Sequence, residues 1–276
     1  VGTIHHPITM DKRIDIKHAE TLSLKLLKWR WYSFLKMQIK VARKLDPIIV
    51  VSENTRKDVV KDFKIDPKKT RKVLHGIDHK TFEPIPSIER KKNQLITTAS
   101  ADVPLKGLIY LIRAYSELLN EFPDLSLVVI GKLRDGPTSN ELDKKDIKNK
   151  VKFISDLTSR EIAELYAEST IAISPSVYEG FGFPAGEAMS CGIPLISTNG
   201  GSLPEVVGNS GIIVPHSNPN ELRKAIKELL LSPEKRKELG EKGRKRVLEK
   251  FTWKRAAKEL VEVYREAISN ADNRSR

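Results

Sequence analysis

The chain has 276 residues, of which 39% are hydrophobic and 31% are charged, and its net charge is +13. This length gives room for one large domain or two modest ones, and the composition excludes a chain that is disordered throughout. The longest apolar runs are strand-sized and too short to span a bilayer. The single cysteine, Cys191, excludes an intrachain disulfide, and we expect it to be a buried packing residue.

In chain order, the N-terminal string VGTIHHP reads as the end of a buried strand, and residues 15–45 are predicted to form one long basic helix. Short β-branched runs then alternate with segments of helical period, which is typical of a doubly wound parallel sheet covered on both faces. The predicted strands are 48–52, 72–75, 95–100, 125–131, 152–154, 170–174, 194–197 and 211–214. The predicted helices are 54–63, 106–121, 159–167, 185–190, 220–231, 233–250 and 252–271, the last with Thr252 as its N-cap.

The richest segment is 174–207, SPSVYEGFGFPAGEAMSCGIPLISTNGGSLPEVV, which starts where a predicted strand ends. Ligands of open α/β sheets bind at such strand ends. Gly180 and Gly182 let the backbone approach a ligand closely. Pro184 marks the first turn of a helix, whose unpaired N–H groups and positive dipole end favour phosphate. The segment therefore predicts a cradle for a diphosphate.

Two glutamates flank this turn, Glu179 in the loop and Glu187 in the helix. Carboxylates accept hydrogen bonds from sugar hydroxyls. Their spacing alone favours an ordinary Gly-rich turn in a Glu-rich chain. The whole string, however, resembles the E-x7-E signature of retaining GT-B glycosyltransferases of family 4.

Five further segments resemble motifs of the same family in the right order, so the resemblance covers essentially the whole chain. They are 46–55, 75–84, 103–107, 151–166 and 200–214. Two positions depart from the family pattern. Ser100-Ala101 replaces the usual Gly-Arg pair, so one phosphate contact is expected to be missing, and His75 stands where Asn is usual. The family's first strands and its acceptor loop would precede Val1.

The resemblance implies an α/β protein of GT-B type, with a complete Rossmann-like donor-binding domain and part of an acceptor-side domain. On this basis residues 1–77 belong to the acceptor side. Residues 78–93, with two prolines and clustered charge, form a linker. Residues 94–252 form the nucleotide-sugar-binding domain, and the helix 253–276 is expected to cross back to the first domain.

The reaction that the resemblance implies is transfer of a hexosyl group from a nucleotide diphosphate sugar to an acceptor hydroxyl, with retention and without a metal or cofactor. The chain has no Asp-x-Asp pair, on which metal-dependent glycosyltransferases of the other main architecture usually rely. The alternative is a nucleotide-sugar-binding module that is inactive without its N-terminal half or a partner chain.

The resemblance also assigns residues to roles. Lys106 would neutralise the diphosphate leaving group, Glu179 would contact the donor sugar or its phosphate side, and His5 would face the donor sugar. Glu187 would bind the ribose hydroxyls, and backbone amides around Gly182, Phe183 and Pro184 would hold phosphate. The remaining expected donor-binding residues are Gly131, Phe153, Ile154, Gly180 and Phe181, with Phe153 and Ile154 beside the base.

The charge of +13 suits nucleic acid, an anionic membrane or a phosphorylated ligand. We expect no nucleic-acid partner, because the chain has no recognisable reading motif. The basic segment 15–45 carries Trp29, Trp31, Tyr32 and Phe34. It would either lie on an anionic membrane or pack its aromatic rings, Trp29 first, into the core. We expect a cytoplasmic protein, peripheral to the membrane in the first case, with a glycan or lipid-linked acceptor.

Overall fold

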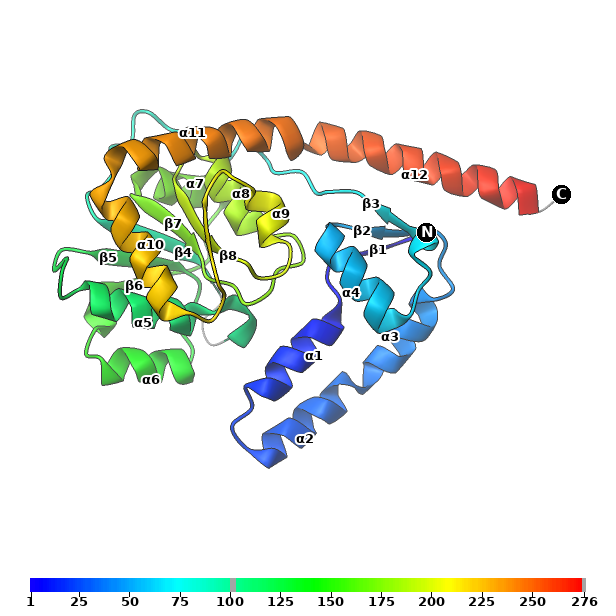
Figure 1. Cartoon of the computed structure of the whole chain (residues 1–276), viewed down its shortest axis with the longest axis horizontal. Coiled ribbons are helices and arrows are strands. Elements are labelled where there is room, and N and C mark those ends of the chain that lie inside the picture. The colour runs from blue at the N-terminus through cyan, green and yellow to red at the C-terminus, as the bar shows by residue number, and fades with distance from the viewer. Residues whose placement is uncertain (100–102, 275–276) are drawn as a thin grey trace. The chain divides into compact units, whose positions relative to one another are not determined.

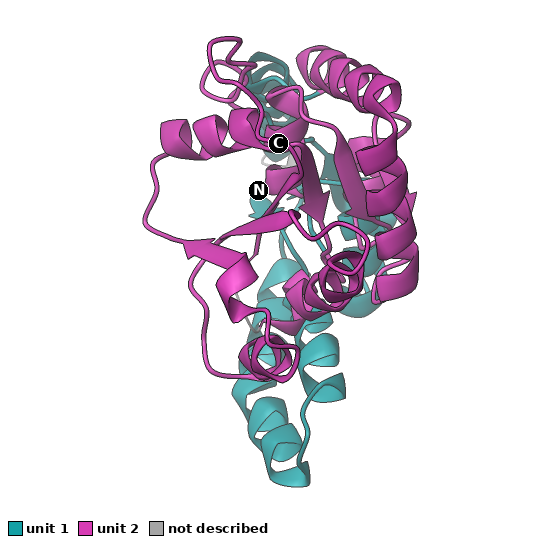
Figure 2. Ribbon diagram, turned by 90° about the vertical axis from the view of Figure 1, so that its left-hand side faces the viewer, with its two compact units in different colours: residues 1–76, 179–181, 251–276 teal, residues 77–178, 182–250 magenta. Residues whose placement is uncertain are grey.

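The computed structural model describes residues 1–99 and 103–274, so the departure at Ser100-Ala101 lies outside the described residues. The chain divides into two compact units, coloured separately in Figure 2. Unit 1 holds residues 1–76, 179–181 and 251–276, and unit 2 holds residues 77–178 and 182–250. Each unit has a parallel sheet of its own.

The sheet of unit 1 has the order β1-β2-β3, formed by Gly2–Ile4, Ile48–Val50 and Thr70–Lys72. Buried Ile48 and Val50 of β2 pack with Val59 and Phe63 of helix α4. Hydrophobic burial of this kind is the main stabilising contribution in a small α/β unit. The helices of unit 1 are α1 (Ile8–Lys17), α2 (Leu22–Trp31), α3 (Leu35–Ala42), α4 (Glu53–Phe63) and α12 (Trp253–Arg274).

The prediction of one helix over 15–45 is wrong. Helix α1 ends at Lys17, and α2 begins after Thr21, whose hydroxyl accepts a hydrogen bond from the Leu24 N–H at 3.2 Å. A threonine that caps a helix start in this way interrupts a continuous helix. The 3₁₀ turn η1 (Tyr32–Phe34) then joins α2 to α3.

The aromatic residues of this region also differ from the core-packing interpretation. Trp29 is 58% exposed, so it is not a core residue. Tyr32 is the buried aromatic, and its hydroxyl donates to the Asp15 carboxylate at 2.8 Å. The Asp15 carboxylate thus satisfies the phenol hydroxyl of the buried ring.

The sheet of unit 2 has six parallel strands in the order β6-β5-β4-β7-β8-β9. Numbered within the unit, this order is 3-2-1-4-5-6, the order of the Rossmann fold. The strands are β4 (Gln94–Thr98), β5 (Ser126–Ile130), β6 (Val151–Ile154), β7 (Ile171–Ser174), β8 (Leu195–Thr198) and β9 (Ile212–Val214). The expected α/β fold with a Rossmann-like domain is therefore confirmed.

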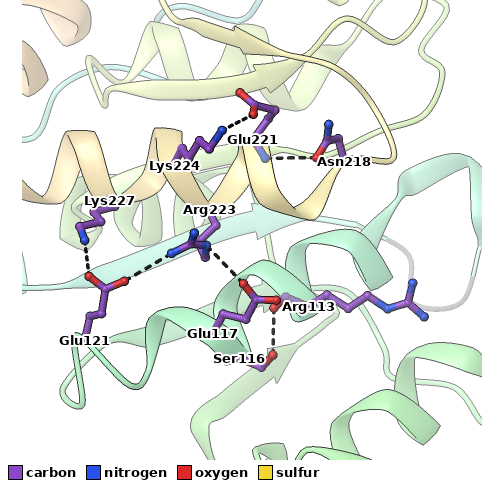
Figure 3. Close-up of polar contacts among 9 residues, drawn as sticks. All are labelled: Arg113, Ser116, Glu117, Glu121, Asn218, Glu221, Arg223, Lys224 and Lys227. Carbon is purple, nitrogen blue, oxygen red and sulfur yellow. Dashed lines mark hydrogen bonds and ion pairs between the residues drawn. The ribbon is translucent and has the colours of Figure 1, made fainter.

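Helices cover both faces of this sheet, with α5 and α10 on one side and α7 and α8 on the other (Figure 1). Arg223 on α10 pairs with Glu117 of α5 and with Glu121 (Figure 3). Such exposed ion pairs add little stability, so buried apolar side chains hold this layer together. The helices are α5 (Leu108–Leu118), α6 (Pro137–Lys144), α7 (Ser159–Glu168), α8 (Phe183–Ser190), α9 (Leu203–Val207), α10 (Pro219–Leu231) and α11 (Pro233–Lys250).

Most predicted elements agree with the structure to within a few residues, including the Thr252 cap, which accepts from the Arg255 N–H at 3.3 Å. The predicted strand 72–75 shares only Lys72 with β3. The short helices α6 and α9 were not predicted, because each has a proline in its first turn and polar or glycine neighbours that resemble a loop.

Candidate active site

The strand order of unit 2 reverses between β4 and β7, and ligands of open α/β sheets bind at the carboxyl ends of the strands at such a point. The loop after β4 ends in the 3₁₀ turn η3 (Pro104–Lys106), and the loop after β7 leads to α8. These two loops lie side by side, since the Val177 N–H donates to the Leu105 carbonyl at 2.8 Å. Leu105, the neighbour of Lys106 in η3, is therefore held to the loop that leads to α8.

Gly107 makes this approach possible. Its φ of +63° is a left-handed conformation that glycine adopts without strain. A Cβ at this position would lie 2.2 Å from the carbonyl oxygen of Pro175. A larger residue would push the Lys106 loop away from the loop after β7.

Gly182, with a φ of +101°, is the N-cap residue of helix α8. The first bond of the helix backbone runs from the Gly186 N–H to the Gly182 carbonyl at 3.2 Å. N–H groups in the first turn have no acceptor within the helix and suit an anion. Pro184 has no N–H, so it contributes its fixed φ rather than a donor. Phe183, in the same turn, is 38% exposed.

Glu187 lies half-buried on α8, and burial raises the pKa of its carboxyl to about 7. A carboxyl desolvated in this way accepts hydrogen bonds from diols strongly once it is ionised. A carboxyl with a pKa shifted in this way, near the carboxyl ends of parallel strands, is a candidate functional group.

Tyr166 fixes the start of α8. It is buried on α7, and its hydroxyl donates to the Pro184 carbonyl at 3.3 Å. Its oxygen lies 3.1 Å from the hydroxyl of Thr98, the last residue of β4. Burial, and after it the charge of Glu187, raises the pKa of Tyr166. The sequence marked Tyr166 only as part of a motif, because its long-range contacts have no local pattern.

Gly131 follows β5, and Phe153 and Ile154 are the last two residues of β6, the edge strand next to β5. The Gly131 N–H donates to the Ile154 carbonyl at 2.7 Å, and Phe153 and Ile154 are half-buried. These three residues therefore form one group on the side of β4 away from β7.

The carboxyl edge of the sheet in unit 1 carries a second group of predicted residues. Here Gly180, from the loop 179–181, accepts hydrogen bonds from Ser52 at 2.9 Å and from Thr55 at 3.0 Å. A Cβ on Gly180 would lie 2.3 Å from the carbonyl oxygen of His5. The loop that carries Glu179 is thus fastened to the ends of β1 and β2.

His5 also meets a residue that the sequence did not single out as functional. Its Nδ1 lies 3.0 Å from Nε2 of His75, which follows β3. The ring of Phe181 packs edge-on against His75, with 5.3 Å between the ring centroids. Parallel strands that end at one edge bring His5, Ser52 and His75 together, which the spacing of these residues along the sequence does not show.

The predicted residues form two groups, one in each unit. Unit 1 holds His5, Glu179, Gly180 and Phe181, and unit 2 holds Lys106, Gly131, Phe153, Ile154, Gly182, Phe183, Pro184 and Glu187. Within residues 1–99 and 103–274, no group of three or more His, Cys, Asp or Glu side chains is arranged to hold a metal ion. In the same described ranges, no helix has the length and apolar character needed to cross a membrane.

Comparison with known families gives one match that covers more than half of the chain. The model of the family described as Glycosyl transferases group 1 matches residues 80–246. The chain is 38% identical over 273 residues to the MMP alpha-(1->4)-mannosyltransferase of Mycolicibacterium hassiacum. That match covers 98% of this chain and 66% of the relative. It is 29% identical over 243 residues to the D-inositol 3-phosphate glycosyltransferase of Streptomyces bingchenggensis, with coverages of 81% and 53%.

Solved structures share the fold. Sucrose-phosphate synthase from Thermosynechococcus elongatus superposes with a TM-score of 0.77 at 22% identity, covering 97% of this chain and 67% of that one. Anabaena HepE in complex with UDP and glucose gives a TM-score of 0.75 at 19% identity, with coverages of 84% and 66%. These likenesses confirm the expected GT-B type of fold. The chain spans between half and two thirds of the length of the two curated relatives.

Proposed function

The chain belongs to the Glycosyl transferases group 1 family, and from that premise we propose that it catalyses the transfer of a hexosyl group from a nucleotide diphosphate sugar to an acceptor hydroxyl. We propose that the transfer retains the anomeric configuration and needs no metal. The observation that carries the proposal is the arrangement at the switch point of unit 2. There the Lys106 loop lies against the loop that leads to α8, and α8 carries the half-buried carboxyl of Glu187.

The proposed roles follow from the chemistry of these groups. The diphosphate binds the first turn of α8, and Lys106 neutralises the charge that develops on the leaving diphosphate. Glu187 accepts hydrogen bonds from the ribose hydroxyls, while Phe153 and Ile154 flank the base. In unit 1, His5 and Glu179 act on the donor sugar.

The names of similar proteins suggest which ligands to test first. HepE is described in complexes with UDP and glucose and with UDP-glucose. The Mycolicibacterium relative is named as a mannosyltransferase that forms an alpha-(1->4) bond. We therefore place glucose and mannose donors first, and a glycan or lipid-linked sugar hydroxyl as the acceptor.

The alternative is a module that binds nucleotide sugar and transfers nothing by itself. The observation that favours it is that the chain spans only 66% of the length of the mannosyltransferase relative. Transfer by the purified chain alone would refute this alternative. The alternative would be supported if the chain bound the donor without transferring sugar, and if adding an N-terminal segment of a relative restored transfer.

The direct test is calorimetric titration of the chain with UDP, GDP and ADP, free and carrying sugars, without added metal. We expect saturable binding of one nucleotide and roughly a tenfold or greater loss of affinity in Glu187→Ala. Glu241→Ala, on an exposed part of α11, is the matched control and should bind as the unsubstituted chain does. Unchanged affinity in Glu187→Ala would refute the ribose assignment.

We also propose that the surface formed by residues 21–44, which include α2 and α3, contacts an anionic membrane. No residue of α2 is buried, and Leu22, Leu26 and Trp31 are 84%, 69% and 73% exposed. Residues 21–44 contain seven Lys or Arg residues and no Asp or Glu. Exposed apolar and aromatic side chains among cations are typical of helices that lie in a lipid headgroup layer.

Sedimentation with vesicles tests this contact. The chain should bind vesicles that contain phosphatidylglycerol, and high salt should weaken the binding. Leu26→Asp should reduce binding roughly tenfold, whereas Leu231→Asp, at a 63% exposed position of unit 2, should not. Equal binding to neutral vesicles, or a dimer that dissociates in Leu26→Asp, would overturn the proposal.

A further inference from the structure

Two histidines at the carboxyl edge of the unit 1 sheet form a direct pair. His5 follows β1, His75 follows β3, and Nδ1 of His5 lies 3.0 Å from Nε2 of His75. The ring planes are within 13° of parallel, and the ring centroids are 5.1 Å apart. The rings therefore meet nearly edge to edge, so that an N–H on one points at the lone pair of the other.

Of the two rings, His75 is the anchored one. It is half-buried, and its ring packs edge-on against Phe181 and at a tilt against Trp253, with 6.0 Å between the centroids of His75 and Trp253. Phe181 in turn packs on the buried ring of Phe251 at 5.8 Å. His5 is exposed. The orientation of the His5 ring thus depends on an anchored neighbour.

We propose that His75 is a positioning residue, which holds the imidazole of His5 in one orientation and one tautomer through the Nδ1–Nε2 hydrogen bond. This inference rests on the proposed function, which gives His5 a role at the donor sugar. A neutral imidazole has one N–H, so the hydrogen bond made at Nδ1 decides whether Nε2 carries a proton. His75 thereby sets what Nε2 of His5 offers to a sugar hydroxyl.

The chemistry of His75 suits this role. Its burial, together with the nearby His5, lowers its pKa to about 4, so it stays neutral at physiological pH. If both imidazoles were protonated, Nδ1 of His5 and Nε2 of His75 would both be donors and would repel each other. With His75 neutral, one of these nitrogens can donate and the other can accept. Gly180 packs against the backbone of His5, and Phe181 packs against the ring of His75. The loop 179–181, which carries Glu179, therefore contacts both histidines.

Two variants at position 75 separate the hydrogen bond from packing. His75→Phe keeps an aromatic ring beside Phe181 and removes both nitrogens. His75→Gln keeps an N–H donor on a side chain of similar reach. The measurement is the nitrogen chemical shifts of the histidine rings in the full chain, with the His5 signals identified by their loss in His5→Gln.

We expect the unsubstituted chain to show a single His5 tautomer. His75→Phe should give averaged ring-nitrogen shifts and roughly a tenfold lower kcat at unchanged donor Kd, and His75→Gln should restore both. Unchanged His5 shifts in a folded His75→Phe chain would overturn the inference. If those shifts respond while His5→Ala transfers sugar normally, the pairing stands and the role of His5 in the proposed function fails.

Discussion

The Ser52 hydroxyl donates a hydrogen bond to the carbonyl oxygen of Gly180 over 2.9 Å, although 128 residues separate them in the sequence. Thr55 donates to the same oxygen at 3.0 Å, so both lone pairs of this buried carbonyl are used. Glu179 therefore lies in a loop fastened to the sheet of unit 1. Glu187, the second glutamate of the signature, lies on a helix of unit 2.

Removing one of these donors should loosen the loop. Thr55→Val keeps the shape of the side chain but leaves the Gly180 carbonyl with one partner, and we expect a loss of about 1 kcal/mol in the free energy of unfolding. Because the loop carries Glu179, turnover should fall by roughly tenfold. Urea unfolding and initial rates measure the two effects. Thr3→Val, at an exposed strand position, is the control, and equal losses in both variants would contradict the assignment.

The sequence predicted the fold well where the pattern is local. Buried strands such as β5 and β7 are continuous apolar runs, and their alternation with helices implies the parallel sheet. The segment 15–45 was misread because its composition favours a helix throughout, whereas the cap at Thr21 depends on one side-chain hydrogen bond.

The same limit applies to the candidate site. The glycines and glutamates of residues 174–207 are adjacent in sequence, so their pattern could be recognised directly. The contacts of Tyr166 with Thr98 and of His5 with His75 span 68 and 70 residues. Contacts of this kind depend on which strand ends meet at one sheet edge, and no local spacing reveals them.

Glu187 should make stability depend on pH in a defined direction. Burial raises its pKa from 4.5 to about 7, so the folded chain holds this proton more tightly than the unfolded chain does. The resulting stabilisation is complete below about pH 4.5 and is lost as the pH rises through 7, with an upper limit of about 3 kcal/mol.

Glu187→Gln tests this dependence because it removes the titrating group and keeps the shape. The variant should gain stability relative to the unsubstituted chain between pH 5 and pH 8, as measured by urea unfolding at each pH. Glu241→Gln makes the same change of charge at an exposed position and should show no such gain. A Glu187→Gln chain that follows the unsubstituted pH profile would show that this carboxyl is ionised in the free protein.

Lys106 should act mainly on the chemical step. Lys106→Met keeps much of the aliphatic stem and removes the charge that we propose acts on the leaving diphosphate, so kcat should fall by about 100-fold or more. Donor affinity, measured by calorimetry, should fall much less. Lys144→Met, at an exposed position at the end of α6, is the control for net charge. A loss confined to affinity would make Lys106 a binding residue only.

Tyr166→Phe should separate the positioning of α8 from general stability. The change removes the hydrogen bond to the Pro184 carbonyl and leaves the Thr98 hydroxyl without its tyrosine partner, at a cost of about 1–3 kcal/mol in the free energy of unfolding. Because the first turn of α8 then loses a fixed contact, nucleotide affinity should fall by roughly tenfold.

Tyr115→Phe is the matched control for this prediction. Tyr115 is also fully buried in unit 2, and its hydroxyl donates to the carbonyls of Leu125 and Lys150 at 2.8 and 2.9 Å. Neither acceptor belongs to the segments around β4, β7 and α8, so Tyr115→Phe should lower stability to a similar extent while leaving nucleotide affinity unchanged. If both variants lost affinity equally, the effect would be a general loosening of unit 2, and Tyr166 would have no particular role in positioning α8.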